Sequence, residues 1–179
     1  MKEIVFAGFG GQGVLTSGLV ISQIAVHKGL KATWIPSYGS AMRGGTANCT
    51  VKYGDGMIYN PSQEEPNILL AMNNPSFIKF VDLMAPGGIA IINSDMVSID
   101  ENTRDDITIV EVPCSTLATE INHSKGANII MAGAIVKLAG DFTEDEGIKG
   151  MNDMFKKKGK EKFEEINTKA FKVGFDYIK

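Results

Sequence analysis

Residues 8–13 constrain the fold of this chain more than any other segment, because they place four glycines between a strand pattern and a helix pattern. The run Ile4-Val5-Phe6-Ala7 is apolar and of strand length. From Val14 to His27 the apolar residues fall at helical spacing, and Gly29 follows as a C-terminal cap. This order of strand, glycine turn and helix predicts a Rossmann-like start to an α/β fold.

The glycine turn has the chemistry of an anion site. Side chains are missing where the backbone must turn sharply, and the first N–H groups of the following helix lack internal partners and point toward a bound anion. The candidate binding residues of this segment are Gly8, Gly10, Gly11, Gln12, Gly13 and Thr16, whose hydroxyl lies in the first helical turn. An alternative is that the glycines only permit close packing of the strand against the helix.

Two familiar nucleotide sites fit this segment poorly. A dinucleotide fold needs an acidic residue about 20 residues after the glycines, at the end of the second strand. The stretch Thr33–Tyr38 contains neither Asp nor Glu. A P-loop needs Gly-Lys-Ser/Thr at its end, and nothing of that kind follows Gly13. The sequence therefore predicts an anion site in which NAD is disfavoured, with a free-standing NAD(P)- or FAD-binding redox or sensor domain as the alternative.

The rest of the chain alternates between strand and helix patterns. Strands are expected at 31–35, ended by Pro36, and at 47–53, 57–59, 67–72, 89–93 and 107–112; helices are expected at 75–83, 115–121 and 128–138. Thr143 and Glu146 form a capping-box pattern for a last helical region that Gly159 interrupts. We therefore expect an α/β three-layer domain with a mixed, largely parallel sheet over residues 1–140. Residues 141–179 would form a C-terminal helical arm of the same domain.

Bulk properties exclude several classes of function. The net charge of −3 is spread over 179 residues, so neither nucleic acid nor a membrane surface is expected as a partner. No signal-peptide pattern opens the chain, and no apolar run reaches the roughly 18 residues of a membrane span. Cys49 and Cys114 match no metal-binding spacing. We expect a cytoplasmic protein with no metal site and no catalytic residue of its own.

A second cluster, Arg43-Gly44-Gly45, follows the second predicted strand. An arginine beside bare backbone N–H groups suits a phosphate or carboxylate ligand, although Arg43 could instead tie down its own loop. Ligands of open α/β sheets bind beyond the carboxyl ends of the strands, where both glycine clusters should meet. Asn128 begins an otherwise apolar helix, where a buried anchor and a contact to a partner are equally good interpretations.

The two clusters together resemble the gamma subunit of 2-oxoacid:ferredoxin oxidoreductases. The resemblance is carried by Gly8-Phe9-Gly10-Gly11-Gln12-Gly13-Val14, by Ser37-Tyr38-Gly39, by Met42-Arg43-Gly44-Gly45, by Pro61, Pro66-Asn67 and Asn128, and by Asn167-x-x-Ala170-x-x-x-Gly174. It therefore spans nearly the whole chain. Two departures are Ser40-Ala41, where many members have an acidic pair, and Asn67, where the family usually has Asp.

The resemblance implies a subunit that is inactive alone. The family's complexes oxidatively decarboxylate a 2-oxoacid, reduce ferredoxin and release an acyl-coenzyme A. Thiamine diphosphate, magnesium and iron–sulfur clusters then belong to partner alpha, beta and ferredoxin-like delta subunits, and this chain would bind no cofactor stably. Coenzyme A would contact the glycine clusters and Asn128. The similarity around Ser37-Tyr38-Gly39 and Thr46-Ala47-Asn48 favours the 2-oxoglutarate branch. The isolated chain is expected to form a homodimer through its subunit contacts.

Overall fold

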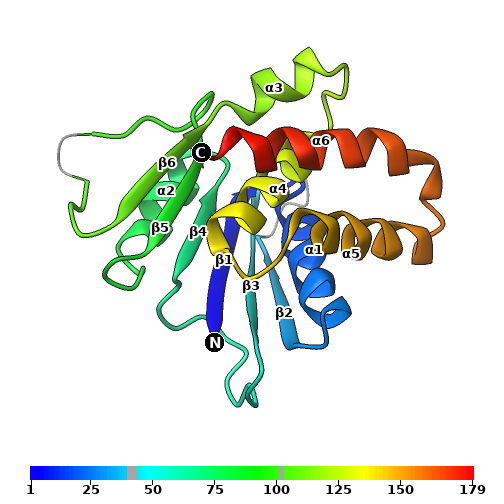
Figure 1. Cartoon of the computed structure of the whole chain (residues 1–179). Coiled ribbons are helices and arrows are strands. Elements are labelled where there is room, and N and C mark those ends of the chain that lie inside the picture. The colour runs from blue at the N-terminus through cyan, green and yellow to red at the C-terminus, as the bar shows by residue number, and fades with distance from the viewer. Residues whose placement is uncertain (40–43, 101–102) are drawn as a thin grey trace.

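The structure, a computed structural model, describes residues 1–39, 44–100 and 103–179 (Figure 1). Its strands are β1 (Lys2–Phe9), β2 (Lys31–Tyr38), β3 (Thr46–Gly54), β4 (Ile68–Ala71), β5 (Ile89–Asn93) and β6 (Thr108–Val112). Its helices are α1 (Val14–His27), α2 (Asn74–Val81), α3 (Cys114–Glu120), α4 (Ala127–Ala139), α5 (Glu144–Lys157), the 3₁₀ helix η1 (Glu161–Phe163) and α6 (Glu164–Tyr177). None of the helices in these ranges is long and apolar enough to cross a membrane.

The six strands form one mixed sheet in the order β2-β3-β1-β4-β5-β6. Strands β1, β4, β5 and β6 are parallel, whereas β3 runs antiparallel to both β1 and β2. The predicted mixed, largely parallel sheet is confirmed. The prediction that Pro36 ends the second strand is wrong, because β2 continues to Tyr38. Since β2 is an edge strand, it tolerates a proline that a central strand would exclude.

Two further local predictions are wrong for tertiary reasons. Residues 57–59 form no strand. Both edges of β3 are already paired, so a hairpin returning from Gly54 finds no free backbone there. Ser115 does not cap α3 but lies inside its first turn. The Asp95 carboxylate accepts hydrogen bonds from the backbone N–H groups of Ser115 and Thr116, both at 2.9 Å, and so caps the helix from a distant part of the chain.

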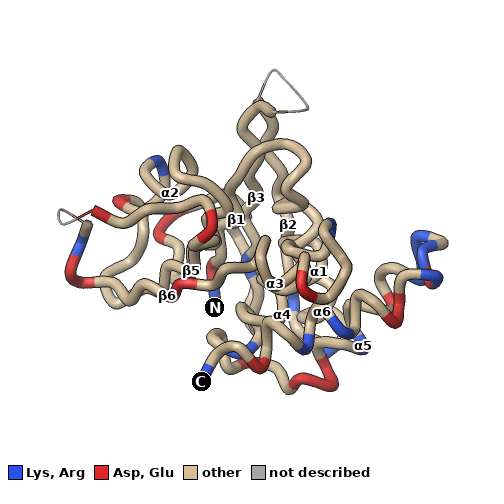
Figure 2. Tube along the Cα trace, turned by 90° about the horizontal axis from the view of Figure 1, so that it is seen from above, with Lys and Arg blue, Asp and Glu red and all other residues tan. Residues whose placement is uncertain are grey.

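The two faces of the sheet are covered by separate hydrophobic clusters, which confirms the three layers. Side chains of β1 alternate between the faces, as a pleated strand requires. Ile4 and Phe6 pack in the cluster that contains α1 and α4, whereas Val5 and Ala7 pack against α2. Viewed from above, α2 lies on one side of the strands and the remaining helices lie on the other (Figure 2). Helix α5 packs on α1, and α6 packs on α4.

Helices α4 and α6 approach so closely that their backbones touch. A Cβ atom added at Gly174 would overlap the carbonyl of Ile130, and one added at Gly133 would overlap the carbonyl of Phe171. Ala170, also at this contact, is fully buried. The spacing Asn167-x-x-Ala170-x-x-x-Gly174 therefore has a packing explanation, because small residues every turn let two helices lie backbone to backbone.

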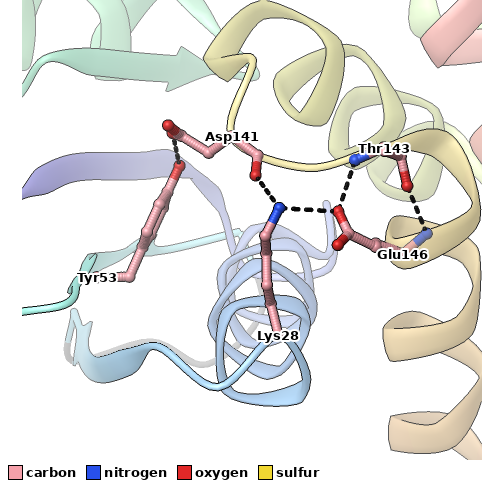
Figure 3. A network of polar contacts seen from close by, with 5 residues as sticks. All are labelled: Lys28, Tyr53, Asp141, Thr143 and Glu146. Carbon is pink, nitrogen blue, oxygen red and sulfur yellow. Dashed lines mark hydrogen bonds and ion pairs between the residues drawn. The ribbon is translucent and has the colours of Figure 1, made fainter.

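A polar network joins the start of α5 to α1 and β3 (Figure 3). It lies near the amino end of β1, where Tyr53 pairs with Lys2, whereas the glycine turn follows the carboxyl end of that strand. The Tyr53 hydroxyl donates to the Asp141 carboxylate at 2.7 Å, and Lys28 Nζ donates to the Asp141 carbonyl at 2.8 Å and to Glu146 at 3.0 Å. Thr143 and Glu146 complete the predicted capping box, with bonds of 2.8 and 3.2 Å. This network ties the C-terminal helices to the central sheet.

Replacing Gly174 with alanine should destabilise the protein, because the contact is with backbone atoms that cannot move independently. We expect Gly174→Ala to lower the free energy of unfolding by at least about 3 kcal/mol. The melting temperature, read by circular dichroism, should fall by roughly 6–12 °C. Gly56→Ala is the matched control, since a Cβ there would meet nothing within 4 Å. Equal melting temperatures for the two variants would contradict the close α4–α6 contact.

The capping box should contribute pH-dependent stability. The Thr143 backbone N–H, followed by Lys28, lowers the pKa of Glu146. A lowered folded pKa means that the contribution is present above the unfolded pKa, about 4.3, and is lost as the pH falls through the folded value. Wild type should therefore have a higher melting temperature than Glu146→Gln at pH 7, and this difference should shrink as the pH falls below about 4.3 and through the lowered pKa of Glu146. Glu111→Gln, at an exposed glutamate on β6, should show no such closing gap.

Candidate functional site

The two glycine segments meet at the carboxyl edge of the sheet, as the sequence predicts. The β1–β3 register places Phe9 opposite Thr46, so the residues just beyond these positions face each other. Gly10 N–H donates to the Gly45 carbonyl at 2.8 Å, and Gly44 N–H lies 3.4 Å from the Gly10 carbonyl. Arg43, the other predicted residue of this cluster, lies outside the described residues. The described part of the site is therefore a double glycine turn.

The backbone of the turn requires glycine at two positions. Gly11 has φ of 104° and Gly13 has φ of 74°, values in the left-handed region that other residues adopt at a cost. Gly13 is the N-cap of α1, and as a glycine it has no side chain with which to cap the helix. The first N–H groups of α1 are thus not satisfied by a side chain of the cap residue. This geometry fits a turn that presents N–H donors to an anion.

Gln12 and Gly8 lie on the inner side of the turn. Gln12 Oε1 accepts hydrogen bonds from Phe9 N–H at 2.7 Å and from Asn73 Nδ2 at 2.8 Å. A Cβ atom at Gly8 would stand 2.7 Å from this same Gln12 oxygen. Glycine at position 8 therefore makes room for the Gln12 side chain. Both residues support the turn from within the protein.

Asn128 anchors the turn to α4. Its side chain is buried, with 8% exposed, and its Nδ2 donates to the Gly13 carbonyl at 3.3 Å. Ser17 Oγ donates to the Asn128 carbonyl at 2.9 Å, which closes a link between α1 and α4. Of the two interpretations of Asn128, these contacts support the buried anchor. A Cβ at Gly13 would come within 2.9 Å of three Asn128 atoms, so the close approach also requires glycine.

Two cavities flank the turn and share Gly11 and Gly13 in their walls. The first, of about 250 Å³, is lined by Phe9, Gly10, Gly11, Gly13, Val14, Leu15, Thr16, Tyr38, Thr46 and Ala47. Thr16 is thus the predicted side chain that faces this cavity. The second, of about 550 Å³, is lined by Gly11, Gln12, Gly13, Met72, Met96, Ser115, Ser124, Lys125, Ala127 and Asn128. The turn is a wall between them.

Sequence reasoning missed the residues that long-range folding brings to the second cavity. Lys125 and Ser124 precede α4, and Met96 follows β5. Asn73 caps α2, accepting from Ser76 N–H at 3.0 Å, and it also contacts Gln12. The sequence signal that could have pointed to this cavity is Lys125, which stands next to Gly126 at the start of a helix.

The electrostatics of the site come mainly from backbone dipoles. The described lining of the first cavity contains no charged side chain, and Lys125 is the charged residue in the described lining of the second. In the view from above, a group of lysines lies instead at the far end of α5 (Figure 2). Turn N–H groups and the positive end of α1 therefore supply much of the attraction for an anion in the described part of the site.

The structure offers no reactive thiol and no metal cluster in residues 1–39, 44–100 and 103–179. Burial raises the pKa of the Cys49 thiol, and of the Cys114 thiol, to about 12. Both cysteines are buried and therefore stay protonated and unreactive at neutral pH. In the same ranges no three His, Cys, Asp or Glu side chains are grouped as metal ligands would be.

The sheet order also changes the geometry that a dinucleotide would need. In a Rossmann fold the second strand lies beside the first, and its end carries the acid that binds the ribose. Here β3 lies between β1 and β2. Two strand spacings, about 10 Å, therefore separate the end of β2 from the glycine turn, and β2 has no Asp or Glu. This arrangement argues against an NAD(P) or FAD site of the Rossmann type.

Comparison with known proteins agrees with this architecture. A family model described as pyruvate ferredoxin/flavodoxin oxidoreductase matches residues 3–177. The 2-oxoglutarate synthase subunit KorC of Methanocaldococcus jannaschii is 31% identical, and the alignment covers 99% of this chain and 94% of that subunit. The ketoisovalerate oxidoreductase subunit VorA of Methanothermobacter marburgensis is 32% identical over 99% of this chain, which spans only 36% of that longer relative.

Solved structures share the fold. The gamma subunit of keto/oxoacid ferredoxin oxidoreductase from Geobacter sulfurreducens superposes with a TM-score of 0.83 at 28% identity, covering 98% of this chain and 97% of that one. A 2-oxoglutarate:ferredoxin oxidoreductase chain from Magnetococcus marinus, solved with 2-oxoglutarate, coenzyme A and succinyl-CoA bound, also gives 0.83. At 20% identity, with 99% of this chain and 31% of that chain covered, it supports the fold alone. The chain belongs to the pyruvate ferredoxin/flavodoxin oxidoreductase family, as a member of its gamma-subunit type.

Proposed function

We propose that this chain is the gamma subunit of a thiamine diphosphate-dependent 2-oxoacid:ferredoxin oxidoreductase that acts on 2-oxoglutarate. The observation that carries the proposal is the match to three KorC subunits from end to end. These subunits are 31–33% identical to this chain, and the alignments cover 94–96% of their lengths. The ketoisovalerate relatives carry the matching region within much longer chains, of which this chain spans 36%. These alignments with 2-oxoglutarate synthase subunits favour 2-oxoglutarate as the substrate.

The chemistry of oxidation must then come from partner subunits. An iron–sulfur cluster of the common type needs four thiolates, and this chain has two cysteines in all. Both are buried, in β3 and at the start of α3. The residues present therefore do not fit such a cluster, and no reaction step is assigned to this chain. Alpha, beta and ferredoxin-like delta subunits would hold thiamine diphosphate, magnesium and the clusters, with ferredoxin as the electron acceptor.

The role of this chain in the complex is to assist coenzyme A access and assembly. The glycine turn offers N–H donors to phosphate, and the first cavity beside it is mostly apolar, with Phe9, Val14, Leu15 and Ala47 in its lining. An elongated ligand with a phosphorylated end and a flexible, weakly polar arm suits that combination. In this proposal Gly10, Gly11, Gly13, Thr16, Gly44 and Gly45 face coenzyme A, while Gly8, Gln12 and Asn128 support them. Arg43, which lies outside the described residues, is proposed as a coenzyme A contact from the sequence alone.

Assembly provides the first test. A tagged copy of the chain, purified from its host, should bring down thiamine diphosphate-dependent subunits in fixed stoichiometry. The complex should reduce ferredoxin with 2-oxoglutarate and coenzyme A, while the isolated chain should show no activity. Recovery of the chain alone under several salt conditions would overturn the gamma-subunit role. Activity of the complex with pyruvate but not with 2-oxoglutarate would overturn the substrate assignment only.

Filling the first cavity tests the coenzyme A contact. Thr16→Phe should raise the KM for coenzyme A at least about 10-fold, equivalent to about 1.4 kcal/mol, because the ring occupies the space beside the turn. The KM for the 2-oxoacid should not change, since that substrate binds on partner subunits. Thr108→Phe is the matched control, at an exposed position on β6. An unchanged KM for coenzyme A in an intact Thr16→Phe complex would leave the chain with an assembly role alone.

A further inference from the structure

We propose that Gln12 is a positioning residue whose carboxamide replaces one rung of the sheet, holds β1 and β4 apart at their carboxyl ends, and sets the glycine turn between them. The glycine motif in the sequence does not by itself assign this role to Gln12. The further idea that the turn positions a ligand rests on the proposed coenzyme A contact. The insertion of the Gln12 carboxamide between β1 and β4, called the wedge below, is a property of the isolated chain. The two parts of the inference can therefore be tested separately.

The register of β1 and β4 shows where a rung is missing. The strands pair in parallel up to Ala7 opposite Ala71, and Met72 N–H donates to the Ala7 carbonyl at 2.9 Å. In a parallel ladder the next bond would run from Phe9 N–H to the Met72 carbonyl. Phe9 N–H donates instead to Gln12 Oε1 at 2.7 Å, and Gln12 Nε2 donates to the Met72 carbonyl at 3.2 Å. The carboxamide thus stands between the two backbone groups that would otherwise bond each other.

Only a primary amide matches both partners at this place. The carbonyl oxygen must accept from Phe9 N–H, and the nitrogen must donate to the Met72 carbonyl. A glutamate can accept but has no donor when ionised, so it would set a carboxylate against a carbonyl. A leucine offers neither group. Gly8 completes the arrangement, because any Cβ there would collide with the Gln12 oxygen.

Asn73 joins the wedge to α2. Its Nδ2 donates to the same Gln12 oxygen at 2.8 Å, and its Oδ1 accepts from Ser76 N–H at 3.0 Å, so one buried amide serves both the turn and the helix cap. The side chain is 2% exposed, and an unpaired amide would be costly at such a site. Gln12 and Asn73 therefore act as one unit. Replacing either should loosen the turn by the same mechanism.

The consequence for function is a glycine turn held in a fixed position. Open α/β sheets bind ligands where neighbouring strands diverge at their carboxyl ends, and here the divergence between β1 and β4 is bridged by a side chain. The turn contains two residues with positive φ, which favour no single conformation in a free chain. The Gln12 bonds and the Asn128 bond restrain it near its two ends, at Phe9 and at Gly13. Without Gln12, the N–H groups of the turn are no longer held in place for a ligand.

The first measurement uses the isolated chain and no ligand. Backbone amide exchange at residues 9–14 should be roughly 10-fold faster in Gln12→Leu and Gln12→Glu than in wild type, the effect of losing about 1.4 kcal/mol of local restraint. Asn73→Asp keeps an acceptor for the α2 cap but removes the donor to Gln12, so it should give a similar increase. Gln23→Leu is the matched control within α1 and should leave these amides unchanged.

The double variant tests whether Gln12 and Asn73 act as one unit. If Gln12 and Asn73 act together, Gln12→Leu combined with Asn73→Asp should exchange no faster at residues 9–14 than Gln12→Leu alone. Additive increases would overturn the coupling. If the amide exchange rates at residues 9–14 in Gln12→Leu and in Gln12→Glu stay within twofold of the wild-type rates, the proposed wedge role of Gln12 would be overturned. If Gln12→Leu proves unstable, Gln12→Glu and Asn73→Asp provide the same comparison with polar side chains.

The second measurement uses the assembled complex. The KM for coenzyme A should rise about 5- to 10-fold in Gln12→Glu, while kcat and the KM for the 2-oxoacid stay within twofold. A general loss of stability would instead lower the amount of active complex and leave the KM unchanged. Faster exchange with an unchanged coenzyme A KM would support the wedge and overturn the ligand-facing role of the turn. Thr16→Phe provides the independent check of that role.

Discussion

Strand β3 runs between β1 and β2 and hydrogen-bonds to both, and the rest of the site depends on this placement. Antiparallel pairing with β1 puts the start of β3 beside the end of β1, so Gly10 bonds Gly45 directly. The same pairing moves β2 to the edge of the sheet, away from the turn. A fold that starts like a dinucleotide-binding unit thereby builds a different crevice. Its walls are two glycine turns instead of one turn and an acidic strand end.

Support for the turn comes from two side-chain amides, of which Asn128 is buried and Gln12 is half-buried. Gln12 reaches toward β4, and Asn128 reaches from α4, so both ends of the turn are tied to regular structure. Close approach at Gly8 and Gly13 leaves no room for side chains where these amides sit. Such contacts place the N–H groups of a short loop without adding a reactive group. A subunit that positions a ligand for chemistry elsewhere needs this kind of rigidity.

The contacts at the other end of the strands, near the amino end of β1, have a structural role instead. There Tyr53, Lys28 and Asp141 join β3, α1 and the loop before α5 through charge-assisted hydrogen bonds (Figure 3). Together with the close α4–α6 contact at Gly174, they hold the C-terminal helices on the sheet. The helical layer that carries Asn128 is thus anchored at both ends.

Local patterns in the sequence were sufficient for the start of the fold, the boundaries of α1 and β5, the capping box at Thr143 and the meeting of the two glycine clusters. The element boundaries and the capping box follow from spacing or turn chemistry within a few residues, whereas the meeting of the clusters follows from the rule that ligand loops of an α/β sheet lie beyond the carboxyl ends of its strands. The position of β3, the continuation of β2 through Pro36, the Asp95 cap and the Gln12 bridge were decided only by tertiary structure. All of these depend on which segments lie side by side. Hydrogen-bond partners far apart in the chain leave no periodic or compositional trace in a single sequence.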